Sequence, residues 1–491
     1  MMALNNFVRS IQNIMRGDAG INGDAQRIEQ MGWMLFLKVW DAREEEWELY
    51  EDGFSSIIPE PLRWRNWAAD RKDGTSPTGD NLLRFVNEEL FPGLKALPVG
   101  ADAPARQAVV RSVFEDSNQY MKDGVLLRQV LNVIDAIDFD DWEESHAFGD
   151  IYEAILKDLQ SAGNAGEFYT PRAVTDFMVG RLAPKLGERV ADFAAGTCGF
   201  LTSALKALEP QARTVEGKEQ YRRSVWGVEK KPMPYLLGIT NLLLHGIDSP
   251  ELYHGNALER DVRDLREADR FDVILMNPPY GGAEQEAVKA NFPADMRSSE
   301  TADLFMALAT YRLKRGGRAA VIIPDGFLFG TDGPKAAIKK RLLESFDLHT
   351  VVRMPSSVFA PYTSITTNIL FFDHSGRTER TWFYRVDMPK GYKHFSKTRP
   401  MLREHFADCE AWWGDRREIP DEGDTFKAKA YAAGELAARG YDLDLCGYPT
   451  AAEEVLSPEE TIRVFHERRA ALNAKIDGQI ARILAALEGR S

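Results

Sequence analysis

Cysteines are scarce in this chain and long apolar runs are missing, and both absences narrow the class of protein. The three cysteines, Cys198, Cys409 and Cys446, lie far apart without CxxC spacing, which predicts neither a disulfide framework nor a zinc site. No apolar run reaches the length of a transmembrane helix, and the amphipathic N-terminus lacks the apolar core of a signal peptide. We therefore expect a protein of the reducing cytoplasm, with no metal site and no membrane contact.

Positive charge is also in short supply. The 491 residues carry a net charge of −14, with a pI near 5.3, which argues against a chain that grips nucleic acid unaided, although a local basic patch can hide in a global sum. The sequence G-x-x-x-x-G-K-[ST] is absent, which excludes a P-loop translocase driven by ATP. There is no internal repeat, and this length predicts two or three domains.

The first third of the chain has the apolar spacing of helices, so we expect a helical N-terminal domain over residues 1–155. Within it, Trp33, Trp40 and Trp47 are interpreted as core residues. The acidic run at residues 44–46 is interpreted as a solvated helix face.

Residues 156–400 alternate strands with helices, which predicts an α/β fold with a Rossmann-like doubly wound sheet. The later strands follow one another too closely for helices between them, so that edge of the sheet should contain an antiparallel pair. The expected strands cover residues 189–193, 224–228, 271–276, 318–324, 348–353, 368–372 and 381–386.

Residues 401–491 lose this alternation and are expected to form a C-terminal tail, with a helix over 457–488. Ser457 suits the N-cap, Pro458 the first helical position, and Glu460 completes a capping box. Apolar residues recur at steps of three and four and predict a seam for a partner helix; packing of this seam on its own domain is the alternative. The seam consists of Phe465, Leu472, Ile476, Ile480, Ile483 and Leu487.

The most informative sequence is Asn277-Pro278-Pro279-Tyr280, directly after the apolar strand at 271–276. Two prolines fix the backbone and remove two N–H donors, so an Asn carboxamide and a proline carbonyl are held at the carboxyl end of a strand, where open α/β sheets bind ligands. The side-chain oxygen of Asn277 and the carbonyl of Pro278 can each accept one hydrogen of a planar amino group, and Tyr280 can stack on its ring. The less specific interpretation is a strand that ends in a Pro-Pro turn.

A second ligand site is predicted after the first two strands. Small residues in the first turn allow a ligand to approach the backbone and the helix N-terminus, and Glu229 ends the second strand, where it can accept hydrogen bonds from ribose hydroxyls. The turn has no Arg or Lys for a pyrophosphate, so the expected ligand is a nucleoside without phosphates, which describes S-adenosyl-L-methionine and not NAD. The candidate cofactor residues here are Asp192, Ala195, Gly196, Thr197, Gly199, Phe200, Glu229, Asn256 and Ala257, with Asn256 against the adenine.

With these motifs identified, the chain resembles the modification (methyltransferase, M) subunits of type I restriction–modification systems, a family of adenine-specific DNA methyltransferases. The resemblance extends over most of the chain, from a cofactor-covering segment before the first strand to a tail motif at 440–444. Two positions depart from the family: Phe193 replaces the usual proline after Asp192, and Asn256 stands where Asp is frequent. The cofactor-covering segment consists of Glu167, Phe168, Tyr169, Thr170, Pro171 and Arg172, and a later target-pocket segment runs from 358 to 372.

The resemblance implies N6-methylation of an adenine that is flipped out of double-stranded DNA, with Asn277, Pro278, Pro279 and Tyr280 as catalytic residues and with Tyr280 and Phe359 stacking on the base. It also implies a separate specificity (S) subunit, a second M subunit and a restriction/translocase (R) subunit as partners. A stand-alone adenine methyltransferase, with residues 400–455 as a recognition domain, is the nearest alternative. A protein-glutamine methyltransferase and a non-enzymatic scaffold are the others.

Overall fold

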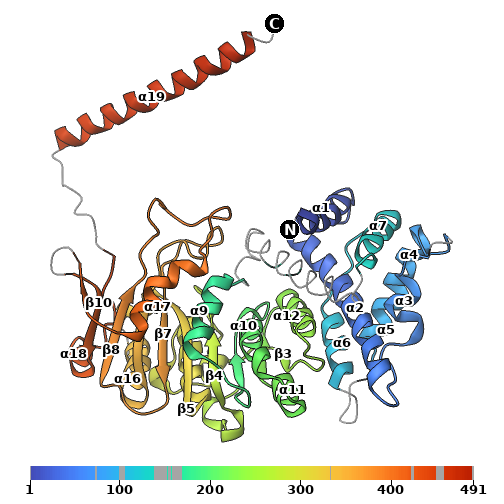
Figure 1. Ribbon diagram of the computed structural model, residues 1–491, viewed down its shortest axis with the longest axis horizontal. Helices are drawn as coiled ribbons and strands as arrows, with labels where there is room; N and C mark the ends of the chain where they lie inside the picture. Colours follow the sequence, from blue (N-terminus) through green and yellow to red (C-terminus); the bar gives the residue numbers. More distant parts are fainter. Residues whose placement is uncertain are drawn as a thin grey trace. The chain divides into compact units, whose positions relative to one another are not determined.

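The computed structural model describes residues 2–71, 74–98, 105–137, 152, 156, 169–331, 333–421, 425–448 and 458–488. It divides into two compact units, Met1–Gly447 and Tyr448–Ser491. The first unit contains a helical N-terminal region and a mixed sheet with helices (Figure 1). Among the described residues, no helix is both long enough and apolar enough to cross a membrane.

The N-terminal region is helical in its described part, as its apolar spacing predicts. Trp33, Trp40 and Trp47 are buried, which confirms their assignment to the core, and the ring of Trp33 meets that of Phe91 edge to face at 5.2 Å. Its helices are α1 (Met2–Arg16), α2 (Asp24–Tyr50), α3 (Trp64–Trp67), α4 (Gly79–Arg84), α5 (Phe91–Lys95), α6 (Ala105–Glu115) and α7 (Gly124–Asp135).

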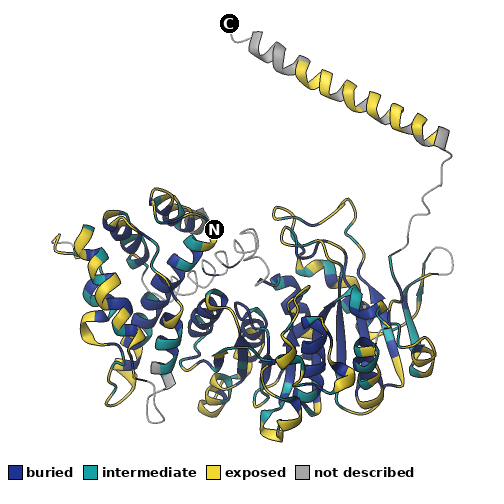
Figure 2. Cartoon of the chain, turned by 180° about the vertical axis from the view of Figure 1, so that it is seen from behind, coloured by how far each residue is buried: buried dark blue, intermediate teal, exposed yellow. Residues whose placement is uncertain are grey.

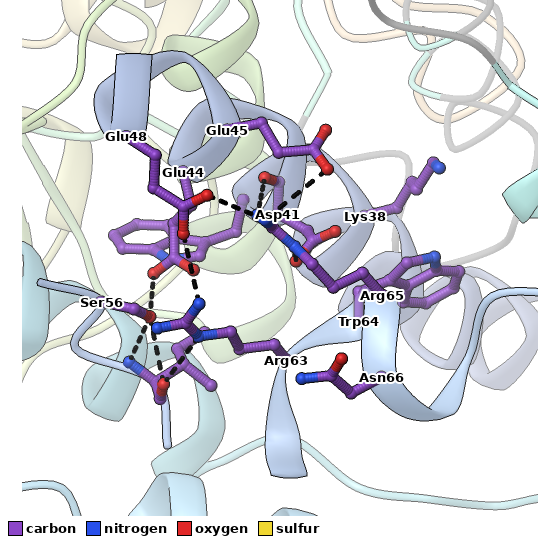
Figure 3. Close-up of polar contacts among 12 residues, drawn as sticks. Lys38, Asp41, Glu44, Glu45, Glu48, Ser56, Arg63, Trp64, Arg65 and Asn66 are labelled. Atoms are coloured by element: carbon purple, nitrogen blue, oxygen red, sulfur yellow. Dashed lines mark hydrogen bonds and ion pairs between the residues drawn. The ribbon is translucent and has the colours of Figure 1, made fainter. Parts of the chain in front are cut away.

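The interpretation of residues 44–46 as a solvated face is wrong for Glu44. Its side chain is buried because it lies on the same side of α2 as Trp40 and Trp47. One carboxylate oxygen accepts hydrogen bonds from Trp40 Nε1 at 3.0 Å and from Ser56 Oγ at 2.7 Å (Figure 3). Burial raises the pKa of Glu44. Only its neighbours Glu45 and Glu46 are exposed.

The described residues form a ten-stranded sheet in the order β3-β2-β1-β4-β5-β7-β6-β8-β10-β9. The seven expected strands are observed, and β7 is antiparallel to both β5 and β6, which confirms the antiparallel edge. The strands are β1 (Val190–Asp192), β2 (Val225–Glu229), β3 (Leu252–His254), β4 (Phe271–Met276), β5 (Leu313–Pro324), β6 (Asp347–Arg353), β7 (Thr367–Asp373), β8 (Arg380–Arg385), β9 (Ile419–Pro420) and β10 (Phe426–Ala432).

Helices cover both faces of the sheet, so most residues of its central strands are buried (Figure 2). Side chains alternate between two cores: Val273 and Leu275 of β4 share one with α9, α10, α12 and α17, whereas Ile274 and Met276 share the other with α14, α15 and α16. These helices are α9 (Arg172–Leu182), α10 (Gly199–Leu208), α11 (Val215–Arg222), α12 (Pro232–Leu244), α13 (Glu286–Lys289), α14 (Thr301–Arg312), α15 (Asp325–Phe329), α16 (Gly333–Ser345), α17 (Ala407–Gly414) and α18 (Ala433–Ala438).

The sheet continues beyond residue 400, where the sequence predicted a tail. Strand β10 pairs antiparallel with β8, and β9 pairs with β10. Residue 436 of α18 then packs into the same core as α14 and α16. The boundary at 400 is therefore wrong, because cross-strand pairing joins residues 419–420 and 426–432 to the sheet. The division at 155, which falls in residues that the structure does not describe, stays a prediction.

The second unit contains helix α19 (Pro458–Glu488), as the apolar spacing predicts. Four residues of its predicted seam, Phe465, Leu472, Ile476 and Ile480, are between 48% and 61% exposed. Ser457 and the side chains of Ile483 and Leu487 lie outside the described residues.

Candidate active site

A cavity of about 380 Å³ opens at the carboxyl ends of β1, β2 and β4. Strand β1 lies between β2 and β4. Strands β2 and β3 follow on one side of β1, and the chain then crosses to β4 on the other side, so the strand order reverses at β1. In an open α/β sheet this switch point is the usual place for a ligand. The cavity is lined by Thr170, residues 192–197, Gly199, Phe200, residues 229–231, residues 255–257, Asn277, residues 279–282, Glu284, Thr301 and Phe305.

The turn between β1 and α10 is shaped by backbone conformations that favour small residues. Gly196 and Cys198 have φ angles of +54° and +64°, which side chains with a Cβ adopt at a cost. Helix α12 packs closely against this turn: a Cβ at Gly238 would lie 2.8 Å from Sγ of Cys198. The turn is thus held against α12, and the exposed N–H groups at the start of α10 face the cavity side.

Glu229, at the end of β2, is tied to this turn. One carboxylate oxygen accepts from the N–H of Gly196 at 2.8 Å and the other from the N–H of Lys231 at 2.7 Å. Glu229 is buried, and burial raises its pKa. Each oxygen has a further lone pair that can accept from a ligand hydroxyl at the cavity.

Asp192 ends β1 and lines the same cavity as Glu229. Its Oδ1 accepts from the N–H of Ala194 at 3.0 Å, and the side chain is almost fully buried. Burial raises the pKa of Asp192 to about 8, and the nearby carboxylate of Glu229 adds to the rise. The cavity therefore holds two buried acidic side chains that suit a cationic ligand, although the charge of Lys231 acts on Glu229 and opposes the rise of its pKa.

Both the nitrogen and the oxygen of the Asn256 side chain contact other groups of the protein. Its Oδ1 accepts from the N–H of Leu258 at 3.1 Å, and its Nδ2 lies 3.4 Å from a carboxylate oxygen of Glu284. Glu284 also forms an ion pair with Lys230 at 3.3 Å. These contacts connect the β2 and β3 ends of the cavity to the loop after Tyr280.

Asn277, at the end of β4, contacts two side chains from different segments. Its Nδ2 donates to Oγ1 of Thr170 at 3.1 Å, and its Oδ1 accepts from the hydroxyl of Tyr280. The carboxamide is therefore oriented with its nitrogen toward the segment before α9. Its oxygen points toward the space beyond Tyr280.

A second, much smaller space of about 20 Å³ lies on the other side of Asn277. The rings of Tyr280 and Phe359 border it, with centroids 6.3 Å apart at 77°. Tyr169, Tyr362 and Thr363 complete its aromatic and polar wall. Asn277 thus borders both the large cavity and the aromatic slot, and Pro278 borders the slot. This arrangement suits two ligands, one in each space, whose reacting atoms meet beside Asn277.

Phe193, where the sequence departs from the family, belongs both to the cavity wall and to the core. Its side chain is buried, and its ring packs against Trp226 at 5.5 Å and Phe271 at 5.7 Å. The guanidinium of Arg312 lies 4.8 Å from the ring centroid of Phe193. The residue borders the cavity and also forms part of the core beneath it.

Most of the predicted site residues converge on these two spaces, with some exceptions. Glu167 and Phe168 lie outside the described residues. Tyr169 borders the small aromatic slot and not the large cavity. Pro171 precedes α9, and Arg172 donates to the carbonyl of Gly199 at 2.6 Å. Sequence reasoning missed Lys230, Lys231, Glu284, Thr301 and Phe305; the first two adjoin Glu229, whereas the last three have no local signal.

In the described segments, no group of three or more His, Cys, Asp or Glu side chains is placed to hold a metal ion.

Comparisons with known proteins match the whole chain. A family model described as N-6 DNA Methylase matches residues 143–455, and one described as HsdM N-terminal domain matches residues 4–134. The methylase subunit of the type I restriction enzyme EcoEI from Escherichia coli is 46% identical over 493 residues, covering 99% of each chain.

Solved structures give the same result. The modification subunit of a putative type I restriction enzyme from Vibrio vulnificus is 41% identical with a TM-score of 0.78, and the match covers 92% of this chain and 98% of that one. A chain from a study of complex assembly and conformational transition of the type I R-M system is 34% identical with a TM-score of 0.80, and covers 98% of each.

Proposed function

The chain belongs to the methylase subunits of type I restriction enzymes, which are N-6 DNA methylases, and we propose that its large cavity binds S-adenosyl-L-methionine and its aromatic slot receives the target adenine. The observation that carries this assignment is the position of Asn277 between the two spaces. The N-P-P-Y carboxamide borders both, so a methyl donor on one side and an amino group on the other meet there.

The residues of the large cavity fit S-adenosyl-L-methionine. Its volume of about 380 Å³ lies in the usual range of small-molecule sites. The buried carboxylates of Asp192 and Glu229 suit a ligand that carries positive charge and ribose hydroxyls. Gly196 and Thr197 allow close approach to the backbone. When bound, this group supplies a methyl on a sulfonium, which leaves behind a neutral thioether without need of a metal.

Asn277 and Pro278 activate the target nitrogen. The exocyclic nitrogen of adenine is a poor nucleophile because its lone pair is delocalised into the ring. The Asn277 Oδ1 and the Pro278 carbonyl accept its two hydrogens and favour a more tetrahedral nitrogen. Positive charge then develops where two acceptors already point, which is preorganised electrostatic stabilisation, and alignment of the reacting atoms supplies the rest.

Entry of the adenine requires a local rearrangement. The slot between Tyr280 and Phe359 has room for about one water molecule, and the Tyr280 hydroxyl occupies the acceptor of Asn277. A flipped base therefore separates the two rings, takes over the hydrogen bond to Asn277 and stacks on the aromatic side chains. Replacement of one hydrogen bond by another keeps the cost of this change low.

The subunit acts within an assembly. We propose that α19, whose described seam residues are exposed, docks on helices of a specificity subunit that brings double-stranded DNA to Asn277, since an isolated helix is marginal in water. A second methylase subunit and a restriction/translocase subunit complete the full complex. The alternative with residues 400–455 as a recognition domain is disfavoured, because residues 419–420 and 426–432 are strands of the main sheet. DNA as substrate places the complex in the cytoplasm.

The test is a methylation assay with labelled S-adenosyl-L-methionine and duplex DNA that contains the target site. The chain co-purified with its specificity subunit should produce 6-methyladenine, and Asn277→Ala should abolish the product while cofactor binding, measured by calorimetry, largely survives. Methylcytosine, or methylated protein without a DNA product, would contradict the proposal. Full activity of the chain alone would favour the stand-alone alternative.

A further inference from the structure

A basic segment follows β8 in this otherwise acidic protein. Residues 388–403 contain five Lys or Arg and no Asp or Glu, whereas the whole chain has a net charge of −14. The loop after β6, residues 354–366, contains no charged residue at all. Five cations thus stand in one short segment without an acidic residue, next to a neutral loop that borders the proposed target slot.

The strand directions place this segment on the same edge of the sheet as Asn277. Strand β5 is parallel to β4, β7 is antiparallel to β5, and β6 is antiparallel to β7, so β6 points the same way as β4. Strand β8 is parallel to β6. The chain therefore leaves β4, β6 and β8 at one edge, where orange loops extend beyond the sheet (Figure 1).

The basic segment is attached to the loop of the target slot. The N–H of Phe395 donates to Oγ of Ser357 at 2.9 Å, and Phe395 is only 1% exposed. Ser357 lies two residues before Phe359, whose ring faces Tyr280. Buried Val386 and Met401 anchor the two ends of the segment. Its apolar residues thus hold it beside the slot.

Four of its five cations lie at the surface, and Lys390 also lines a small pocket with Asp387, Glu404 and Asp408. Lys390, Lys393, Lys397 and Arg399 are exposed, and within the described part of the chain Lys390, Lys393 and Arg399 form no ion pair. Ser396 and Arg399 form backbone hydrogen bonds of 3.0 and 3.1 Å with each other. This tight turn holds the backbone that carries Lys397 and Arg399. Arg403 differs, because it pairs with Glu410.

We propose that Lys390, Lys393 and Arg399 bind phosphates of the DNA duplex beside the flipped adenine. The inference rests on the proposed function, since it takes the slot at Tyr280 and Phe359 as the place of the base. Exposed lysines and arginines without carboxylate partners are the usual contacts to DNA phosphates, which position a duplex and read no sequence. The neutral loop at 354–366 borders the slot that receives the base, and the cations beside this loop bind the DNA backbone.

The experiment uses the complex with its specificity subunit. In the test variant the three cations are replaced by Ala; in the matched control Lys206, Arg213 and Lys218, which are also exposed but precede the start of β2, are replaced by Ala. DNA affinity is measured against salt concentration. Each lost phosphate contact reduces the slope of log K against log salt by roughly 0.9, so the test variant should lose about 2 to 3 from the slope and the control nothing.

Further readouts separate the possible failures. The test variant should bind S-adenosyl-L-methionine normally and regain methylation at low salt, and a version with the same positions all Arg should behave like wild type. An unchanged salt slope in an otherwise active complex overturns the inference and leaves the proposed function intact. Loss of co-purification with the specificity subunit also overturns it, since the segment would then bind an acidic protein surface. Absence of methylation by the wild-type complex contradicts the proposed function itself.

Discussion

The side-chain amide of Asn277 donates a hydrogen bond of 3.1 Å to Oγ1 of Thr170, although 107 positions separate them in the sequence. Thr170 belongs to the segment before α9, which the resemblance assigned to the cofactor. The contact fixes the nitrogen end of the carboxamide and so leaves the oxygen end for the incoming amino group. Thr170 is therefore in place to orient the proposed catalytic acceptor, in addition to bordering the proposed cofactor cavity.

Replacement of Thr170 by Val should lower kcat with little change in cofactor affinity. A neutral hydrogen bond contributes about 0.5–1.5 kcal/mol, so kcat should fall by up to roughly tenfold, and Thr170→Ser, which keeps the hydroxyl, should restore it. Steady-state kinetics and calorimetric titration of S-adenosyl-L-methionine measure the two effects. A loss of affinity with kcat intact at saturation would place Thr170 on the cofactor alone.

Replacement of Glu229 by Ala should weaken cofactor binding. Loss of a charge-assisted hydrogen bond costs about 1.5–3 kcal/mol, which corresponds to roughly ten- to a hundredfold in affinity. Calorimetric titration of the purified chain measures this change. Exposed Glu219 on α11 provides the control, because Glu219→Ala removes equal charge far from β2's carboxyl end. Equal affinities of the two variants would remove Glu229 from the site.

The affinity for S-adenosyl-L-methionine should rise with pH below about 8. Burial raises the pKa of Asp192 to about 8 in the ligand-free protein, so this carboxyl carries a proton at pH 6.5. A cationic ligand favours the carboxylate, and binding at pH 6.5 therefore releases a proton. Affinity should increase by up to tenfold per pH unit toward pH 8. The ligand's own amino group remains protonated at pH 6.5.

Calorimetry in two buffers of different ionisation enthalpy counts the protons released in that experiment. Asp192→Asn should abolish the release attributed to this side chain and flatten the pH dependence. If wild type releases no proton at pH 6.5, Asp192 is already ionised before the ligand arrives.

Truncation before residue 457 should leave a folded, cofactor-binding protein that no longer co-purifies with the specificity subunit and no longer methylates DNA. Ile476→Asp should act similarly, because an unpaired carboxylate buried at the seam costs several kcal/mol. Ala474→Asp, at an exposed position on the other side of α19, is the matched control. Normal assembly and methylation by the truncated chain would show that the partner contact lies elsewhere.

Local patterns in the sequence accounted for much of the fold. The apolar run at 271–276 predicted β4, and the prolines after it predicted a stiff turn that presents Asn277, because strand spacing and proline geometry depend on neighbouring residues only. The same holds for α19, whose apolar spacing lies within one segment. The charge and the motifs likewise predicted a methylase that depends on a partner.

Other features depended on contacts between distant residues. Helical spacing alone does not reveal that Glu44 is buried against Ser56, or that a strand at 426–432 pairs with β8. Nor does it show that Glu284 meets Asn256. The sequence by itself determined the elements and the catalytic motif, because short-range sterics and apolar periodicity specify them. Only the tertiary structure decided that Thr170 orients Asn277 and that the basic segment lies beside the target slot, because chain segments far apart in sequence meet only when the sheet is assembled.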